Sequence, residues 1–191
     1  MYFNNQSIKQ YSKIFADAMK IEYDTITKNE ETRRMFRFTD SEAETKRDGL
    51  TFDANGIVGF PKKLAQMFTK NTTESWNKTS TKNAGFKGFM KGLDSTKGFI
   101  FFTTDKNTFS SQVNVGRDFY QYCLALTKSG YYMHPLNQAI QEYTEMDILR
   151  GDLDKLYKVK SEEKIQMIAR IGKSDLPFES YRRHLDNFDV K

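Results

Sequence analysis

One apolar strand followed by one long amphipathic helix is the pattern that most constrains this fold. The run GFIFFTT, residues 98–104, contains no charged residue and has the length of a strand. It predicts a central, buried strand. A helix is predicted from about 108 to 129 because apolar side chains recur there at near-helical intervals, namely Val115, Phe119, Tyr122, Cys123 and Leu126. Gly130 follows at the position of a C-terminal cap.

Two further elements are predicted in the second half of the chain. Thr144 and Asp147 resemble a capping box for a helix whose apolar face carries Met146, Leu149, Leu153 and Leu156. Residues 164–171 alternate between apolar and polar, which predicts a strand with one apolar side made by Ile165, Met167, Ala169 and Ile171. The tail around Pro177 is predicted to be extended, with room for a third strand.

The first half gives weaker signals. A helix is predicted over 6–22, a short second helix from an Asn29 N-cap to near Phe38, and a third over 61–69 with Pro61 in its first turn. The rest of 39–97 shows no period and is interpreted as an irregular lid, an arm that wraps a neighbour, or a disordered segment. The whole chain, 1–191, is expected to form one domain.

Composition narrows the functional classes. Thirty Lys and Arg against 25 Asp and Glu give a formal charge of +5, but the two signs are interleaved. Aromatic and basic residues are not gathered into a groove or a recognition helix, so a nucleic-acid partner is disfavoured. The N-terminus does not resemble a signal peptide and no run of about 18 apolar residues occurs, which predicts a cytoplasmic protein without a membrane partner.

The chain lacks the short motifs of enzymes that use their own side chains. It contains no CxxC, HExxH, GxSxG or Walker sequence, and His134 and His184 lie fifty residues apart. No metal site is predicted. The single cysteine, Cys123, lies in an apolar helical stripe and is interpreted as a buried packing residue. Any catalysis is therefore expected to come from a bound cofactor.

Four segments together resemble a known family. They are FIFFTTDKNT, VGRDFYQYCLALTKSGYYMHPLNQ, EKIQMIARIGKSD and SYRRHLDNF, and the upstream NEETRRMFRFTDSEAETKRDGL fits as well. In this order they resemble the C-terminal half of nitroreductase-like flavoproteins, in the long, internally duplicated Acg-like branch. The resemblance covers most of residues 30–191, although almost nothing between 55 and 97 can be matched.

The resemblance implies an α+β fold in which helices flank a central, mainly antiparallel sheet. It also implies an FMN oxidoreductase that takes electrons from NAD(P)H and passes them to a quinone or nitroaromatic acceptor. In that family the flavin lies at the seam between two similar halves, and the N-terminal half has no counterpart here. We therefore expect either a fragment of a longer chain, which we favour, or a homodimer. The alternative function is a flavin-sequestering or stress-linked protein without turnover.

The resemblance places the flavin ring at the turn after the long helix. Gly130 would end the helix, Pro135 would fix the path of the chain, and Leu136, Asn137 and Gln138 would present backbone and amide groups to the ring. The alternative is that Asn137 and Gln138 only bond nearby backbone, as such residues often do in turns.

Two groups of arginines are considered as binding or surface residues. Arg182 and Arg183 would clamp the FMN phosphate, the alternative being a solvated pair that faces Asp186 and Asp189. A second group, interpreted as surface or interface charges on a helix, comprises Arg33, Arg34 and Arg37.

Overall fold

The computed structural model describes residues 5–173 and 180–188. The chain divides into two compact units, each built from two segments of sequence. The first comprises residues 1–24 and 85–174, and the second comprises residues 25–84 and 175–191. The single domain that the sequence predicts over 1–191 stays a prediction.

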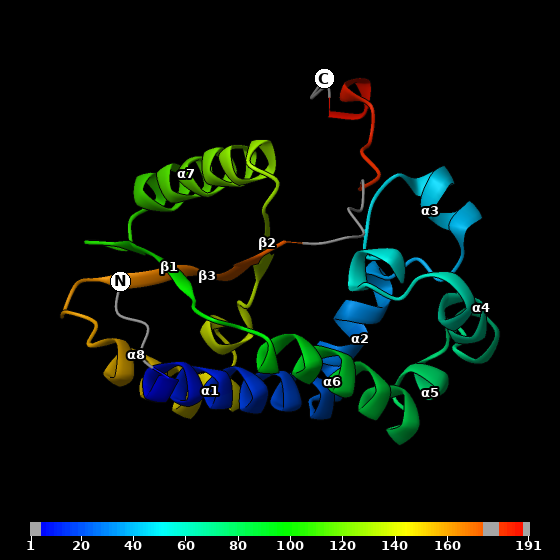
Figure 1. Cartoon of the computed structure of the whole chain (residues 1–191), viewed down its shortest axis with the longest axis horizontal. Helices are drawn as coiled ribbons and strands as arrows, with labels where there is room; N and C mark the ends of the chain where they lie inside the picture. Colours follow the sequence, from blue (N-terminus) through cyan, green and yellow to red (C-terminus); the bar gives the residue numbers. More distant parts are fainter. Residues whose placement is uncertain (1–4, 174–179, 189–191) are drawn as a thin grey trace. The chain divides into compact units, whose positions relative to one another are not determined.

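The first unit has three layers around a small antiparallel sheet (Figure 1). Its strands are β1 Ile100–Thr104, β2 Tyr132–Pro135 and β3 Lys164–Gly172, in the order β1-β3-β2. Helix α7, Phe109–Lys128, covers one face; the layer on the other face contains α1 Asn5–Asp24, α8 Asp147–Tyr157, the short turns η2 Gln138–Ile140 and η3 Thr144–Met146, and the later turns of α6 Thr79–Asp94.

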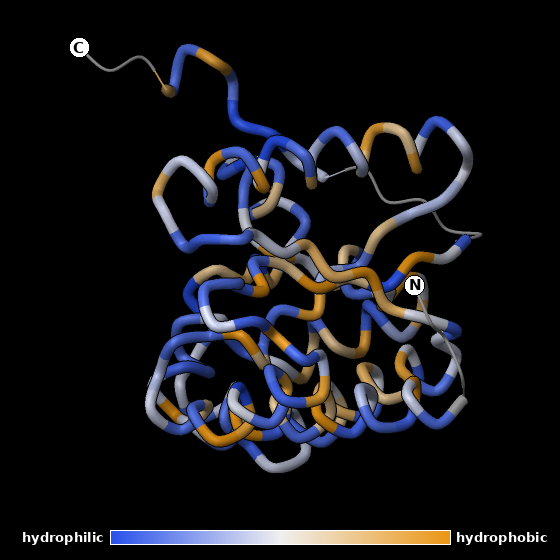
Figure 2. Tube along the Cα trace, turned by 90° about the vertical axis from the view of Figure 1, so that its left-hand side faces the viewer, coloured by the Kyte–Doolittle hydropathy of each residue, from blue (hydrophilic) through white to orange (hydrophobic). Residues whose placement is uncertain are grey.

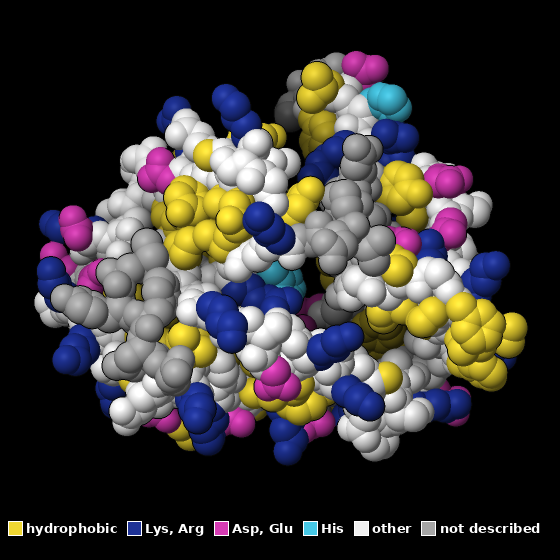
Figure 3. All heavy atoms as spheres, in the orientation of Figure 1, with side chains coloured by type: hydrophobic (Ala, Val, Ile, Leu, Met, Phe, Trp, Pro, Cys, Tyr) yellow, Lys and Arg dark blue, Asp and Glu magenta, His cyan; other side chains and the backbone are white. Residues whose placement is uncertain are grey.

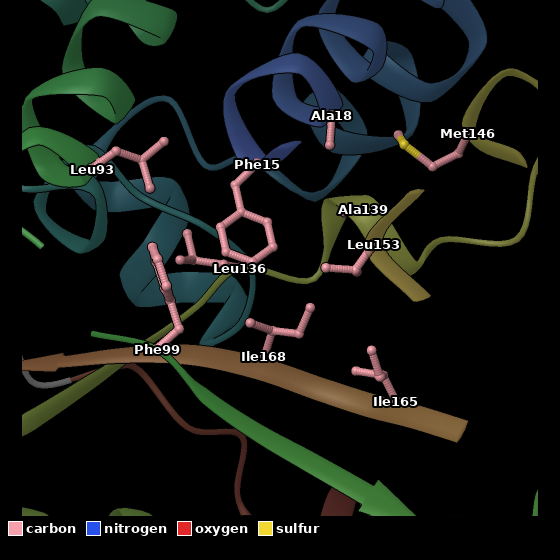
Figure 4. Packing of buried hydrophobic residues seen from close by; sticks show 10 residues of the cluster. All are labelled: Phe15, Ala18, Leu93, Phe99, Leu136, Ala139, Met146, Leu153, Ile165 and Ile168. Atoms are coloured by element: carbon pink, nitrogen blue, oxygen red, sulfur yellow. The ribbon is translucent and has the colours of Figure 1, made fainter. Parts of the chain in front are cut away.

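The core of this unit lies between the sheet and the α1 layer. Phe15 and Ala18 of α1 point into it, as the predicted helical stripe requires, and Phe15 meets Phe99 edge to face with 4.9 Å between ring centroids (Figure 4). The buried residues of this core are Phe15, Ala18, Leu93, Phe99, Leu136, Ala139, Met146, Leu153, Ile165 and Ile168. Along these helices hydrophobic and hydrophilic residues alternate (Figure 2), so each helix can bury one face.

Two predictions about this unit need correction. The strand at 98–104 exists as β1, but it lies at the sheet edge and is half-buried, whereas β3 is central. The alternation predicted for β3 fails because the register shifts between Phe102 and Thr103, which leaves Gln166 as an extra residue. Ile165 and Ile168 therefore both point into the core (Figure 4).

The helix predictions in this unit hold better than the predicted caps. Helices α1, α7 and α8 occupy the predicted regions, and Gly130 follows α7 with φ +73°. The capping box was wrong, because η3 precedes α8 and no side chain caps it. Cys123 is half-buried rather than buried, and partial burial raises the pKa of its thiol. The extended stretch predicted around Pro177 lies outside the described residues.

The second unit is helical. It contains α2 Ile26–Met35, α3 Asp40–Lys46, η1 Asp53–Asn55, α4 Gly59–Phe68, α5 Thr73–Trp76, the first turns of α6 and η4 Leu185–Phe188. Its small core consists of Phe36, Phe38 and Phe52 with Trp76 against them, and the Phe36 ring lies 4.9 Å from Phe52 and 5.2 Å from Trp76.

The prediction of an irregular segment over 39–97 was wrong. Most of this segment is helical: α4 confirms the helix predicted at 61–69, and α6 adds sixteen residues that were not predicted. Two of the short helices, α3 and α5, begin at threonine caps. Thr39 accepts a hydrogen bond from the Glu42 amide, and Thr72 accepts one from the Ser75 amide. The role of this segment as a lid stays a prediction.

The predicted N-cap of α2 was also wrong. Thr25 occupies that position, and Asn29 lies inside α2, where it is almost fully buried. Asn29 donates to Asn77 and accepts from the Trp76 indole, so its side chain joins α2 to the α5 region instead of starting a helix.

Candidate functional site

The turn after α7 places the predicted ring-binding segment at the edge of the sheet. Gly130 takes a left-handed conformation, and the Tyr131 amide donates to the carbonyl of Leu126, which closes the helix. The chain then enters β2, which pairs with β3 so that His134 lies opposite Arg170 and Pro135 opposite Ala169. Pro135 has no amide proton to donate, and an edge strand tolerates this.

The two residues after Pro135 continue the pairing of β2 with β3, one through its backbone and the other through its side chain. The Leu136 amide donates to the Ile168 carbonyl at 2.8 Å, and the Ile168 amide donates to Oδ1 of Asn137 at 2.9 Å. The Asn137 side chain thus takes the place of a backbone carbonyl. For Asn137, this geometry is that of the alternative in which the side chain bonds nearby backbone.

Leu136 and Gln138 differ in whether they have groups that could contact a ligand. The Leu136 side chain lies in the core and its amide is engaged, so it offers no wall to a ligand. Gln138 is half-buried, and in the described part of the chain its side-chain amide has no hydrogen-bond partner. Among the described residues, Gln138 thus has a side-chain amide without a hydrogen-bond partner, whereas Asn137 is engaged through Oδ1.

A guanidinium group that was not among the predicted site residues lies beside this segment. Arg170 donates from Nε to Nδ1 of His134 at 2.9 Å, and its Nη1 donates to the carbonyl of Gly92 in α6. A Cβ at Gly92 would come within 2.8 Å of the Arg170 guanidinium, so a larger residue there would displace the end of that side chain. Two strands and one helix thus hold Arg170 in place.

The charge of Arg170 is not neutralised by a carboxylate within the described residues. Both of its partners are neutral acceptors, and partial burial lowers the pKa of the guanidinium. A half-buried cation without a counter-ion favours any group that is negative or gains negative charge beside it. This property makes the Arg170 cluster, formed by Gly92, His134 and Arg170, the strongest candidate site.

His134 is an exposed residue at the sheet edge, and its ring lies against the Arg170 guanidinium, which opposes protonation. Desolvation by the surrounding protein atoms and, secondly, the Arg170 charge lower the pKa of His134 to about 4. Because Nδ1 accepts the bond from Arg170, the imidazole proton lies on Nε2. The cluster therefore presents one cation and one neutral donor.

Arg182 and Arg183 belong to the second unit. The Arg182 carbonyl accepts a hydrogen bond from Nε of Arg47 at 2.7 Å, and the Arg183 guanidinium lies 5.0 Å from the centroid of the Phe188 ring. Neither arginine forms an ion pair within the described residues, and Asp189, one predicted partner, lies outside them. The hydrogen bond from Arg37 and, among weaker causes, the Arg183 charge lower the pKa of Asp48.

The interpretation of Arg37 as a surface charge on a helix was wrong. Arg37 lies beyond the end of α2, is buried, and donates from Nε and Nη2 to Oδ1 of Asp48 at 2.9 and 2.6 Å. Arg33 is half-buried and pairs with Glu30 at 2.9 Å, whereas Arg34 is exposed. Arg37 thus supports the fold of the second unit.

Other parts of the molecule offer less chemistry. An open hollow of about 530 Å³ lies beside the end of β1 and the start of α7, lined by Thr103, Thr104, Asp105, Lys106, Thr108, Ser111, Asn114, Val115 and Asp118. Thr104 pairs with Lys164, six residues from Arg170 and therefore about 20 Å along β3. In the described ranges, no group of three or more His, Cys, Asp or Glu could hold a metal ion.

Comparison with known proteins returns no relative. No family model, no curated protein and no solved structure matches this chain. The described helices include none with both the length and the apolar character to cross a bilayer. The nitroreductase resemblance therefore stays a prediction, and the chemistry of the site must be argued from its own residues.

The sequence carries one signal for Arg170. In KIQMIARIG it is the only charged residue between Lys164 and Lys173, inside an otherwise apolar or neutral strand. Such a residue needs a partner or a function. Its contacts with Gly92 and His134 join positions 78 and 36 residues away, which periodicity does not predict.

A pH titration tests the state of His134. Because its pKa is below the usual value of 6.5, the unfolded chain binds more protons between pH 6.5 and 4, and protonation of His134 destabilises the fold there. We expect the unfolding free energy of the wild type to fall more steeply over this range than that of His134→Gln, which keeps an acceptor for Arg170. Chemical denaturation at each pH measures the difference.

Nuclear magnetic resonance measures the pKa of His134 directly. The protein has two histidines, and His134→Gln assigns their ring signals. A ring of His134 that titrates at or above 6.5 would contradict the described arrangement.

Proposed function

We propose that this chain is an FMN-dependent oxidoreductase of nitroreductase type, which takes electrons from NAD(P)H and passes them to a quinone or nitroaromatic acceptor. The observation that carries the proposal is the half-buried Arg170 guanidinium, which has only neutral partners within the described residues. It lies beside the segment that the family resemblance assigns to the flavin ring.

Arg170 fits the chemistry of a reduced flavin. Bound FMN would supply hydride and electron transfer, and its pyrimidine edge gains negative charge on reduction. A fixed cation beside that edge stabilises the reduced form. Arg170 is held by the His134 ring and the Gly92 carbonyl, so it needs little reorganisation to serve in this way.

The predicted ring contacts fit only in part. Within the described residues the Gln138 side-chain amide has no partner, and Gly130 lies in open space where a Cβ would meet nothing within 4 Å. Leu136 and the side chain of Asn137 do not fit, because both are engaged in the first unit. In this proposal Arg170 and Gln138, together with the exposed backbone after Gly130, replace the original contact set.

The resemblance assigns the FMN phosphate to Arg182 and Arg183, which lie in the second unit, and we keep this as a proposal about that unit alone. In the described residues neither has a carboxylate partner, so their donors can meet a dianion. A sheet of three strands is small for an independent flavin domain. We therefore also propose that a second copy of the chain, or an N-terminal half of the same protein, completes the site.

Removing the charge of Arg170 tests the proposal. The protein saturated with FMN and desalted should retain the flavin, and Arg170→Gln should weaken FMN binding about tenfold, the loss of one charge-assisted interaction of about 1.4 kcal/mol. Arg117→Gln, an exposed position on α7, removes the same charge and should change binding less than twofold. Isothermal titration measures both.

The outcomes separate the alternatives. Binding of FAD but not FMN, or of neither, would overturn the proposal. Tight FMN binding without steady-state oxidation of NADH or NADPH would instead identify a flavin-sequestering protein.

A second experiment tests the phosphate assignment alone. Replacing both Arg182 and Arg183 by alanine should weaken FMN at least tenfold more than riboflavin, because only FMN carries the phosphate. Riboflavin and FMN are titrated into the same variant, so the unphosphorylated ligand is the control. An equal loss for both would show that the two arginines support the fold.

A further inference from the structure

Helix α4 of the second unit exposes the apolar side that a surface helix usually buries. Phe60 is 71% exposed and Phe68 is 73% exposed, and Leu64 and Met67 are exposed with them (Figure 3, right edge). Their spacing of i, i+4, i+7 and i+8 gathers the four side chains on one side of the helix. We call them the α4 face. Exposed apolar patches of this kind mark binding surfaces.

The opposite side of α4 is polar and is fixed to the rest of the second unit. Nζ of Lys62 lies 2.7 Å from Asp40 and 2.5 Å from Asp53, and the Gln66 amide donates to Asp40 at 3.1 Å. Ala65 packs against the aromatic core. All of these residues belong to the second unit, so this unit alone sets the outward direction of the α4 face.

The charges around the α4 face are mainly positive. Residues 54–84 contain five lysines and one acidic residue, although the two signs interleave over the chain as a whole. Lys63 precedes Met67 by one helical turn and so lies at the border of the face, and Lys70 follows Phe68 by two residues. Both lysines are exposed, and within the described residues neither ammonium group has a carboxylate partner.

We propose that the α4 face binds the surface of a membrane that contains anionic phospholipids. The helix would lie parallel to the bilayer, with its four apolar side chains at the boundary between headgroups and acyl chains. Lys63 and Lys70 would reach the phosphate and carboxylate groups of the headgroups. The proposal does not rest on flavin binding.

This proposal revises the expectation that the protein has no membrane partner. That expectation rested on the absence of a run of about 18 apolar residues, which a helix needs to cross a bilayer. A helix that lies on the surface needs no such run. The ten residues of α4 span about 15 Å and carry one apolar side with lysine beside it, which is the pattern of a surface-bound helix.

The area of the α4 face favours a lipid surface over a second protein. From the exposed fractions, the four side chains offer roughly 450 to 500 Å² of apolar surface. A stable protein interface buries about 800 Å² on each partner, which is well above this area. Reversible binding to a membrane needs less contact, because the insertion of apolar side chains and the attraction of lysines to anionic lipid act together.

Sedimentation of the intact chain with vesicles tests the proposal. We expect binding to vesicles that contain phosphatidylserine, and binding at least fivefold weaker to vesicles of phosphatidylcholine alone. Phe68→Glu should weaken binding to the anionic vesicles at least tenfold, because it removes a large apolar side chain from the contact and adds a negative charge. Lys63→Gln should weaken it about fivefold, the effect of one lysine near an anionic surface.

Two matched variants serve as controls. Ile148→Glu changes an exposed apolar residue of α8, and Lys128→Gln removes an exposed lysine at the end of α7, both in the first unit. Each should change vesicle binding less than twofold. Circular dichroism checks that every variant is folded.

A tryptophan placed in the α4 face locates the contact. The only tryptophan of the chain, Trp76, packs against the aromatic core of the second unit, so brominated lipid should leave the fluorescence of the wild type nearly unchanged. In Phe68→Trp the new indole would enter the acyl chains, and its emission should be quenched by the same vesicles. An unquenched Phe68→Trp in the presence of bound vesicles would contradict the proposal.

Other results would overturn the proposal too. A wild type that binds neither kind of vesicle would do so. Binding that Lys63→Gln weakens but Phe68→Glu does not would show adsorption by charge alone. Self-association of the wild type that Phe68→Glu abolishes, without any vesicle binding, would assign the α4 face to a protein partner instead.

Discussion

Two hydrogen bonds at Ile168 hold together the part of the molecule on which the proposed function depends. The Leu136 amide and the Asn137 side chain both bond the backbone of this residue, at 2.8 and 2.9 Å. They carry the pairing of β2 with β3 past Pro135, which cannot donate. They also place Leu136 in the core and, two residues earlier on the same strand, His134 opposite Arg170.

Arg170 is consequently held by contacts within the first unit. Its guanidinium is oriented by the His134 ring on one side and by the Gly92 carbonyl on the other, and neither partner neutralises its charge. A fixed charge that is partly shielded from solvent interacts more strongly with another charge than it would in water. In the proposed function, this fixed charge serves binding of the flavin.

The sequence predicted those elements whose apolar period is long or whose composition is uniform. Phe15 and Ala18 marked α1, and Val115 marked the buried side of α7, because a long helix repeats its pattern over several turns. In the region from 39 to 97 only the helix at 61–69 was predicted, and α4 confirms it. This helix presents its apolar side to solvent and its Lys62 side to the protein.

The candidate site was predictable only in its location. The segment after Gly130 was found, but the roles of its members depend on Ile168, which lies some thirty residues further along the chain. Because Gln166 is an extra residue in β3, Ile168 faces the core although the predicted alternation placed it on the other side of the strand. Arg170, two residues later, lies on the same side as Ile168 and reaches Gly92. Single-sequence patterns do not contain such a bulge, because it arises from the pairing of two strands.

A spectroelectrochemical titration of the FMN-saturated protein tests the central claim, that Arg170 serves a bound flavin, most directly. If Arg170 lies beside the flavin edge that gains charge, the two-electron midpoint potential of the bound FMN is higher than that of free FMN, and Arg170→Gln removes this increase. A bound flavin whose potential is equal to or below that of free FMN, or is unchanged by Arg170→Gln, would contradict the account.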